Sequence, residues 1–487
     1  MKKSLSVLLT AALLLGLMAL PASAAALEEI TILYPGDETD EMTAFLEGPF
    51  AEKMAQELNM KVNFIFLSWD NYWDQKKIML AAQTPIDLYW DGLPDLATMV
   101  NNKEAQPLDD LIAKCWPDSM KDIIPDSQLA GGRIGGVQYG IPSAYAPSSA
   151  MYQFVCLRQD MLEAVGMDSV STAEDLHEFA QRVADQIPSM KGPADIIFKP
   201  LTRYFADEQY FWVGSQDLCV FGEETKQAYS YASTSAFEKV ARFNREMYLD
   251  GLYSDDLSIK YNERDSRMQT GLYLWVEGSL GKENEISGAV KTGDPNAVLK
   301  NYLLRPDAPK YINATGGEVL CVPYSATNPE GAMKFLAWLW GSQDNYLFCL
   351  YGVRGEDYDI DANGRLVKLS DTARGDGYFY EWMFRNANYQ VFSDNISDEY
   401  IAMYKSWDDN AIPSAMLGFA FSNENLEAVE TACNEVYAKE IAPILYGFVD
   451  FDAEYPSAIE HLKAAGIDQY VEALNTQLAA FIAGNNK

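Results

Sequence analysis

Two aromatic–acidic pairs at predicted strand ends are the residues best suited to chemistry in this sequence. Trp69-Asp70 follows the alternating segment 61–67, and Trp90-Asp91 closes the short apolar segment 87–90. A flat indole stacks on the C–H face of a sugar ring, while a neighbouring carboxylate hydrogen-bonds its hydroxyl groups. The pattern favours a site for a neutral polyhydroxylated molecule, although aromatic residues that fill a core would give the same pattern.

Templates for catalysis are mostly missing. His177 and His461 are the only histidines and lie far apart, which argues against a Ser-His-Asp triad or a histidine-bound zinc. No P-loop, nucleophile elbow or dinucleotide-binding glycine motif occurs. A carboxylate pair for glycoside hydrolysis stays open, because 71 acidic residues offer many such pairs. We expect a protein that is not an enzyme and that needs no cofactor or metal.

The segment 359–364 resembles the beginning of a calcium-binding loop. The twelfth position of such a loop needs a bidentate Glu, and this sequence has Ser370 there. Asn363-Gly364 is instead typical of the tight turn of a β-hairpin between Tyr358 and Leu366. We expect the hairpin.

The overall charge limits the class of partner. The chain has 487 residues, with 71 acidic and 37 basic side chains and a formal net charge of −34. A phosphate backbone or an anionic membrane needs a concentrated basic surface, so no nucleic acid or membrane partner is expected. A content of 48% hydrophobic and 13% aromatic residues excludes a disordered acidic chain. A neutral or cationic solute fits this charge.

The first 24 residues have the pattern of a secretory signal peptide. Lys2 and Lys3 precede an apolar run at 5–20, and 21–24 offers small residues for cleavage after Ala24. This run is too short for a convincing membrane anchor. The first cysteine is Cys115, so a lipid-anchored N-terminal cysteine is excluded if Met1 is the true start. We expect an exported protein, either periplasmic or extracellular at the cell surface.

The cysteines are scattered and form no C-x-x-C motif. One or two disulfides stay open for an exported protein, but buried free thiols in apolar strands are the preferred interpretation. The six are Cys115, Cys156, Cys219, Cys321, Cys349 and Cys433.

Strands and helices alternate in the first part of the chain. Strands are expected at 29–34, 61–67 and 87–90, and helices at 43–58 and 70–83. Strands separated by helices indicate βαβ units and a mostly parallel sheet, and hence an α/β fold. Further elements are a hairpin and strand at 135–142, a strand at 150–157, a helix at 158–167 and a helix that Thr172 caps.

Several motifs occur in a characteristic order along 29–485. They include 135–142 (GGVQYGIP), 271–278 (GLYLWVEG), 323–339 (PYSATNPEGAMKFLAWL), 351–358 (YGVRGEDY) and the tail motif 418–421 (GFAF). Together they resemble the extracellular solute-binding proteins of bacterial ABC importers, of the carbohydrate type. The tail is similar to a C-terminal region of undefined role in one subgroup of that family.

The resemblance implies an α/β fold of the type II periplasmic-binding-protein class, in which two lobes joined by hinge strands close on a ligand like a venus flytrap. The first lobe would hold 27–143 and 304–350. The second would hold 148–302 and 352–487, including the C-terminal helical region. Crossings between the lobes are expected near 142–149, near 302–306 and near Tyr351.

The resemblance also implies ligand-facing residues, most of them at strand ends. Gly36, Gly278 and Tyr204 are additional candidates. The main positions are Asp37, Ser68, Trp69, Trp90, Asp91, Tyr145, Trp212, Glu277, Phe419 and Phe421.

The expected function is capture of an oligosaccharide or related solute between the lobes and its delivery to the permease subunits of an ABC transporter. We expect a monomer, whose closure follows from ligand contacts shared by both lobes. One alternative is the same fold with a cationic peptide or polyamine as ligand. A secreted glycan-acting enzyme and a purely structural surface protein are alternatives of other classes.

Overall fold

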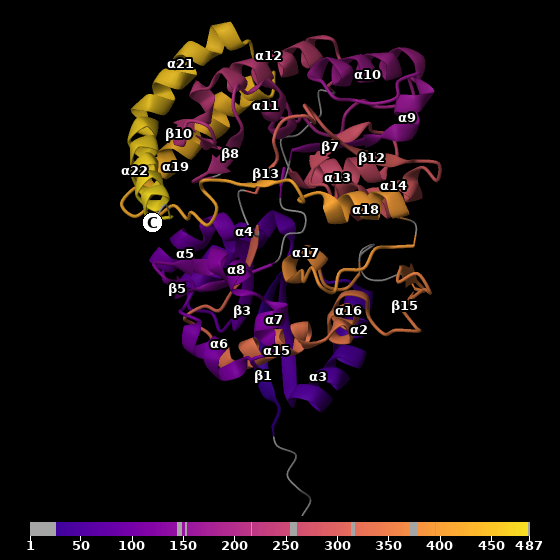
Figure 1. Ribbon diagram of the computed structural model, residues 1–487, viewed down its shortest axis with the longest axis vertical. Coiled ribbons are helices and arrows are strands. Elements are labelled where there is room, and N and C mark those ends of the chain that lie inside the picture. The colour runs from indigo at the N-terminus through magenta and orange to yellow at the C-terminus, as the bar shows by residue number, and fades with distance from the viewer. Residues whose placement is uncertain are drawn as a thin grey trace, which may run out of the picture.

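The molecule has two bodies stacked along its longest axis (Figure 1). We call the lower body in this view the first lobe and the upper body the second lobe. The computed structural model describes residues 26–143, 149–150, 153–215, 217–253, 261–312, 317–370, 377–394 and 396–485. The signal peptide expected at 1–24 and the candidate Tyr145 lie outside these residues.

The first lobe is built on a sheet whose strand order is β2-β1-β3-β14-β6. β1 pairs in parallel with both β2 and β3, which confirms the expected βαβ units at the start of the chain. β14 runs antiparallel to its neighbours β3 and β6. The strands are β1 (Glu28–Pro35), β2 (Met60–Leu67), β3 (Leu88–Gly92), β6 (Gly140–Pro142) and β14 (Glu318–Cys321).

Helices surround this sheet, and one of them differs from the sequence prediction. The single helix expected at 43–58 is interrupted at Gly48, whose φ of −99° and ψ of −108° are not helical. Pro49 follows and has no N–H to donate, so the helical hydrogen-bond ladder breaks there. The helices of this lobe include α2 (Asp40–Phe45), α3 (Ala51–Leu58), α4 (Trp69–Ala81), α5 (Leu96–Asn101), α6 (Asp109–Cys115), α7 (Met120–Ile123), α8 (Asp126–Leu129), α15 (Pro329–Gly341), α16 (Gln343–Tyr351) and α17 (Glu381–Phe384).

The second lobe contains antiparallel sheets. β7 (Phe154–Arg158) lies between β11 (Trp275–Gly278) and β12 (Leu299–Leu303), and both pairings are antiparallel. β8 (Tyr210–Val213), β9 (Cys219–Gly222) and β10 (Gln227–Ser230) form a second antiparallel sheet. The parallel pairing expected from residues 29–90 is therefore confined to the first lobe, because the partners of β7 come from distant parts of the chain rather than from a βαβ repeat.

The helices of the second lobe cover one large apolar core and two smaller apolar clusters. α10 (Ala173–Gln186) begins as predicted, because the Thr172 side chain accepts a hydrogen bond from the Asp175 N–H and the Asp175 carboxylate accepts one from the Thr172 N–H. The C-terminal helices pack on the same core as β9 and α12. The helices are α9 (Gln159–Ala164), α11 (Lys199–Phe205), α12 (Ser235–Leu249), α13 (Tyr261–Gln269), α14 (Lys282–Gly293), α18 (Asp398–Ser406), α19 (Glu427–Val436), α20 (Ala442–Leu445), α21 (Phe451–Ala464) and α22 (Ile467–Asn485).

The third crossing between the lobes was expected near Tyr351. Core packing places it later in the chain. Tyr358, Tyr378 and Phe384 are buried in the core of the first lobe, although the sequence assigns 352–487 to the second. Phe392 and Tyr400 instead pack with Phe154 and Leu280 at the second lobe. We propose that the chain passes between the lobes after Val391, because Tyr389 and Val391 still pack on the first-lobe core, whereas Phe392 already packs with Phe154.

The stretch after β12 also packs on the second lobe. Leu304 and Tyr311 contact its core, and β13 (Tyr311–Ile312) pairs in parallel with β17 (Ile412–Pro413). We propose that the first lobe resumes only after this stretch, later than residue 304.

Two smaller expectations, the hairpin and the free cysteines, are met. β15 (Tyr358–Ile360) and β16 (Leu366–Lys368) form an antiparallel hairpin. The Asp361 carboxylate accepts the N–H groups of Asn363 and Arg365 at 2.8 Å each, so it stabilises the turn and confirms the hairpin. All six cysteines are free thiols, and all but Cys115 are buried. Within the described residues, no helix has both the length and the apolar character needed to cross a bilayer.

Candidate functional site

Six aromatic residues gather at one edge of the first-lobe sheet, and we call them the aromatic cluster. Trp69 opens α4, Trp90 lies in β3, and Trp382 belongs to α17, from a distant part of the sequence. Ring centroids are 5.8 Å apart for Trp69 and Trp90 and 5.1 Å apart for Trp90 and Trp382. The members are Trp69, Tyr72, Trp73, Trp90, Tyr380 and Trp382.

The cluster has an inner and an outer part. Trp90 is only 7% exposed and supports the others, whereas Trp73 is 41% exposed. Trp69 and Trp382 are half-buried, so each presents part of its ring to solvent. Trp382 is stacked on Tyr380 with centroids 4.8 Å apart. The exposed faces of these rings form the surface that could stack against a ligand.

Strand ends position this edge. In the register of β1 and β2, Pro35 pairs with Leu67, so Asp37 and Ser68 both follow at the same edge of the sheet. Trp90 and Asp91 lie at the end of β3, the other parallel neighbour of β1. The structure therefore brings together five predicted residues of the first lobe: Asp37, Ser68, Trp69, Trp90 and Asp91.

The polar residues of this group differ in their surroundings. Asp37 is exposed and follows Gly36, whose φ of +98° turns the chain after β1. The Ser68 hydroxyl accepts a hydrogen bond from the Asn71 amide at 2.8 Å. Asp37 is therefore the most accessible carboxylate among the predicted residues of this edge.

Asp91 is occupied by a buried ion pair. Its carboxylate pairs with the Lys76 ammonium, and the two side chains are 4% and 3% exposed. It also accepts the N–H of Gly92 at 2.8 Å. The Lys76 ammonium lies 4.5 Å from the centroid of the Trp73 ring, a cation–π distance. Asp91 and Lys76 therefore hold α4 and its tryptophans against β3, which is a supporting role.

The predicted second-lobe residues are more buried. The half-buried Trp212 packs edge to face on Tyr231 at 4.6 Å and on Phe198 at 5.6 Å. The Lys199 ammonium lies 5.7 Å from the Trp212 ring. Trp212 thus has one face in the core of the second lobe, and the structure does not bring it into the aromatic cluster.

Glu277 is a buried acid under α11. It is 4% exposed, and its carboxylate accepts the N–H groups of Phe198 and Lys199 at 3.2 and 3.1 Å. Burial raises the pKa of Glu277 to about 7; the Lys199 charge lowers that pKa and the nearby Asp195 charge raises it. Gly278 follows on the same strand, and a Cβ there would collide with the Lys282 side chain. This acid therefore anchors the beginning of α11.

Two predicted aromatic residues pack on the last helix. Phe419 meets Phe481 with centroids 5.5 Å apart, and Phe421, 7% exposed, meets Tyr470 at 5.2 Å. Tyr204 donates to Glu174 at 2.7 Å, within the second lobe. These rings contribute to the core or to its margin, and Phe419 and Phe421 hold the segment that follows them.

That segment contacts the first lobe. The Asn101 amide of α5 donates to the Ser422 hydroxyl at 3.1 Å, and the Thr98 hydroxyl donates to the Asn423 amide oxygen at 3.4 Å. α5 lies directly below the C-terminal end of the chain in Figure 1. The lobes therefore touch through residues that begin one position after Phe421.

Two acidic residues from different lobes lie near this contact. Asp95 of the first lobe lies close enough to Glu430 of α19 for their charges to interact. The pKa of Asp95 is raised to about 6, mainly because the surrounding atoms withdraw its carboxyl group from water; the charges of Asp91 and Glu430 also raise this pKa, and the Lys76 charge lowers it. Because its side chain still reaches solvent, Asp95 is accessible to a solute between the lobes.

Sequence reasoning did not identify Trp73, Tyr380 or Trp382 as members of this cluster. Trp73 could have been found, because a residue four positions after Trp69 lies on the same face of the predicted helix. Tyr380 and Trp382 carried no such signal, since only the tertiary fold brings them to Trp69. Trp275 is fully buried in the second-lobe core.

A depression of about 390 Å³ lies away from the aromatic cluster. It is bounded by 424–426 and by polar side chains of α22, including Glu472 and Gln477, and no aromatic ring lines it. The stacking surface and this concavity are therefore different places on the molecule.

Comparison with known proteins identifies the class. Residues 49–350 match the family model described as bacterial extracellular solute-binding protein, and 415–483 match a domain of unknown function. The chain therefore belongs to the bacterial extracellular solute-binding proteins, as its motifs indicated.

The individual relatives share little sequence identity with this chain. A carbohydrate ABC transporter substrate-binding protein of Streptococcus pneumoniae is 22% identical over 451 residues, covering 90% of this chain and 87% of the relative. The N-glycan transport solute-binding protein NgtS of the same species, in complex with Man1GlcNAc, is similar with a TM-score of 0.77 and 17% identity over 94% of this chain and 100% of that one. FusA of S. pneumoniae, in complex with kestose, is similar with a TM-score of 0.66 and 13% identity over 94% of this chain and 100% of that one. These structures confirm the two-lobed α/β fold.

Proposed function

We propose that this protein captures an oligosaccharide between its two lobes and delivers it to the permease subunits of an ABC importer. The observation that carries the proposal is the aromatic cluster, whose partly exposed rings stand at the end of parallel strands. Figure 1 places α4 and α17, which carry Trp69 and Trp382, at the face of the first lobe that is turned toward the second. Ligands of α/β sheets bind beyond such strand ends.

The chemistry of the edge fits a sugar. Indole faces stack on C–H groups of a pyranose or furanose ring, and Asp37 and Asp95 can accept hydrogen bonds from its hydroxyl groups. The relatives bound to Man1GlcNAc and to kestose support this ligand class. We propose that contacts from both lobes to one solute favour the closed arrangement.

The proposal includes a protein that is exported and that releases its ligand unchanged. An acidic surface without a membrane-spanning helix among the described residues suits a monomer outside the cytoplasm that docks to a permease. A hydrolase acting on glycans would need two carboxylates about 5–9.5 Å apart across the bound sugar. Release of product from the bound oligosaccharide would favour that enzyme over a transport receptor.

A ligand panel tests the proposal. Isothermal titration with a mannosyl-N-acetylglucosamine, kestose, a cationic peptide and a polyamine should give saturable binding for a saccharide alone. Small-angle scattering with that saccharide should give a smaller radius of gyration than without it. If only the cationic peptide or the polyamine binds, the ligand is a cationic solute and not an oligosaccharide. If nothing binds across a broad glycan panel, the result contradicts a transport receptor and favours a structural surface protein.

A further inference from the structure

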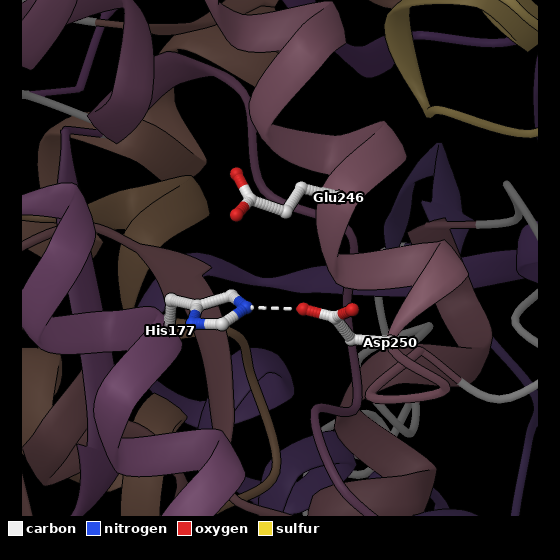
Figure 2. Close-up of side chains that lie close together, drawn as sticks. All are labelled: His177, Glu246 and Asp250. Atoms are coloured by element: carbon white, nitrogen blue, oxygen red, sulfur yellow. Dashed lines mark hydrogen bonds and ion pairs between the residues drawn. The ribbon is translucent and has the colours of Figure 1, made fainter.

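Three side chains with metal-binding atoms converge on the surface of the second lobe, and the solute-binding function does not use them. His177 comes from α10, Glu246 from α12, and Asp250 caps the C-terminal end of α12. One ligand atom from each residue lies within 4.8 Å of the others. His177 Nε2 is 2.8 Å from an Asp250 carboxylate oxygen (Figure 2).

The electrostatics of this place favour a cation. Glu246 and Asp250 are four residues apart, so their like charges lie on the same face of α12. They stand at the negative end of the helix dipole, where basic residues are favourable, yet the last turn of α12 has none. Two carboxylates at this end repel each other and the helix dipole unless a positive charge joins them.

The ion pair between His177 and Asp250 leaves the nearby Glu246 carboxylate without a role in the fold. His177, once protonated, can pair with Asp250. Within the part of the chain that the structure describes, the Glu246 carboxylate has no hydrogen bond or ion pair of its own. Figure 2 shows it turned toward the space beside the His177–Asp250 pair. A purely structural pair therefore leaves one carboxylate that only adds repulsion.

We propose that His177, Glu246 and Asp250 bind one divalent transition-metal ion, with Zn²⁺ as the natural occupant. An imidazole nitrogen with carboxylate oxygens suits Zn²⁺ better than Ca²⁺ or Mg²⁺, which prefer oxygen ligands alone. Tetrahedral Zn²⁺ holds such ligand atoms about 3.4 Å apart. Small side-chain rotations provide this spacing, with the ion replacing the proton between His177 and Asp250 and water in the fourth position. The ion would tie α10 to the end of α12.

Titration of the untagged chain tests this site. We expect one equivalent of Zn²⁺ to bind by isothermal titration, and Co²⁺ to give the intense visible absorption of a four-coordinate site. His177→Gln and Glu246→Gln should each weaken Zn²⁺ binding by at least the roughly 10–100-fold that follows loss of an outer-shell partner. Circular dichroism and Tm establish that each variant is folded.

The chain offers a matched control in His461. Its Nδ1 lies 2.7 Å from Glu440, so it also forms a surface histidine–carboxylate pair. Among the described residues, no third ligand joins that pair. His461→Gln should therefore bind Zn²⁺ as the wild type does. Equal binding by wild type and folded His177→Gln would overturn the site, as would an equal loss in His461→Gln.

Glu246→Gln separates a metal site from a structural pair. Without metal it should keep or raise Tm, because it removes repulsion from Asp250, and it should lose the rise in Tm that Zn²⁺ gives the wild type. A lower metal-free Tm together with an unchanged Zn²⁺ response would assign Glu246 to folding and contradict the proposal.

Discussion

The Trp69 indole donates a hydrogen bond from Nε1 to the Tyr380 hydroxyl at 3.2 Å, across a sequence separation of 311 residues. The Tyr380 N–H in turn donates to the Tyr34 hydroxyl of β1 at 2.7 Å. A late segment of the chain is therefore fastened to the strand ends that the first part of the chain builds. The aromatic cluster therefore forms only when both segments are folded together. Its outer rings are partly exposed, so they can be substituted without removing the buried Trp90 that supports them.

Trp382→Ala tests the outer rings. Loss of a stacking surface should weaken oligosaccharide binding by about 1–3 kcal/mol, or roughly 5–150-fold in Kd. The fold should be retained, because Trp382 is only half-buried. Titration of wild type and variant with the same saccharide measures the change.

Trp338 supplies the control for that variant. It is also half-buried, but its indole donates to Glu57 at 2.7 Å, and Trp338 is not among the rings of the aromatic cluster. Trp338→Ala should leave the Kd unchanged. If it weakens binding as much as Trp382→Ala does, the effect belongs to general destabilisation and not to stacking.

Trp90→Ala should act mainly on stability. A 7% exposed indole that supports four other rings leaves a cavity on truncation, at a cost of about 3–5 kcal/mol in the free energy of unfolding. Any loss of ligand affinity in this variant is then measured under conditions in which the variant is fully folded. Urea unfolding of Trp90→Ala and Trp90→Phe checks this, and a loss in Trp90→Ala below about 1 kcal/mol would show that the ring is not a support.

The Lys76–Asp91 pair gives a second stability prediction. Lys76→Met leaves a buried carboxylate without its partner, which should cost about 3–5 kcal/mol. Adding Asp91→Asn removes the unpaired charge and should restore part of the loss. Lys121→Met, at an exposed pair with Asp118, should leave Tm unchanged. No recovery in the double variant would mean that packing of the Lys76 stem on Trp73, rather than charge, holds α4 in place.

Local sequence signals predicted the elements better than their assembly. The period of two around Val62, Phe64 and Phe66 and the cap at Thr172 are short-range effects, and the structure agrees with both. The break at Gly48 was missed because apolar spacing continues across it. The lobe to which 358–384 belongs depends on which of the two apolar cores buries Tyr378 and Phe384. The sequence shows that these side chains are apolar, but no local pattern shows which core they join.

The candidate site divides in the same way. Strand ends located Trp69, Trp90 and Asp91 at one edge, because parallel pairing follows from βαβ order, whereas Asp37 and Ser68 came from the family resemblance. The sequence could not show that Asp91 forms a buried ion pair with Lys76, since burial of both partners is a tertiary property. It also could not separate a ligand-facing ring from a core ring at Phe421 and Trp212, because both uses select the same residue type.

Glu277 predicts a pH dependence of stability. Its pKa rises from 4.5 to about 7 on folding, so the folded chain holds a proton that the unfolded chain has lost. The Glu277 contribution to the free energy of unfolding therefore falls as pH rises through about 4.5–7, by at most about 3 kcal/mol. Glu277→Gln should remove this fall and be the more stable protein at pH 8. Parallel urea titrations at pH 5 and pH 8 check it, and equal pH slopes in both proteins would contradict the assignment.

Asp95 and Glu430 predict that pH also affects the distance between the lobes. Above its pKa of about 6 the Asp95 carboxylate is charged, and the Glu430 charge across the contact made by α5 and Asn423 disfavours that charged form. As pH falls through 6 toward 3.8, Asp95 takes up a proton in the folded state and the repulsion disappears. The ligand-free protein should therefore have a smaller radius of gyration at pH 5 than at pH 8, by small-angle scattering. Asp95→Asn should be compact at both values, whereas Asp118→Asn, at a fully exposed acid, should behave as the wild type. A pH response in Asp95→Asn as large as that of the wild type would exclude this pair as its origin.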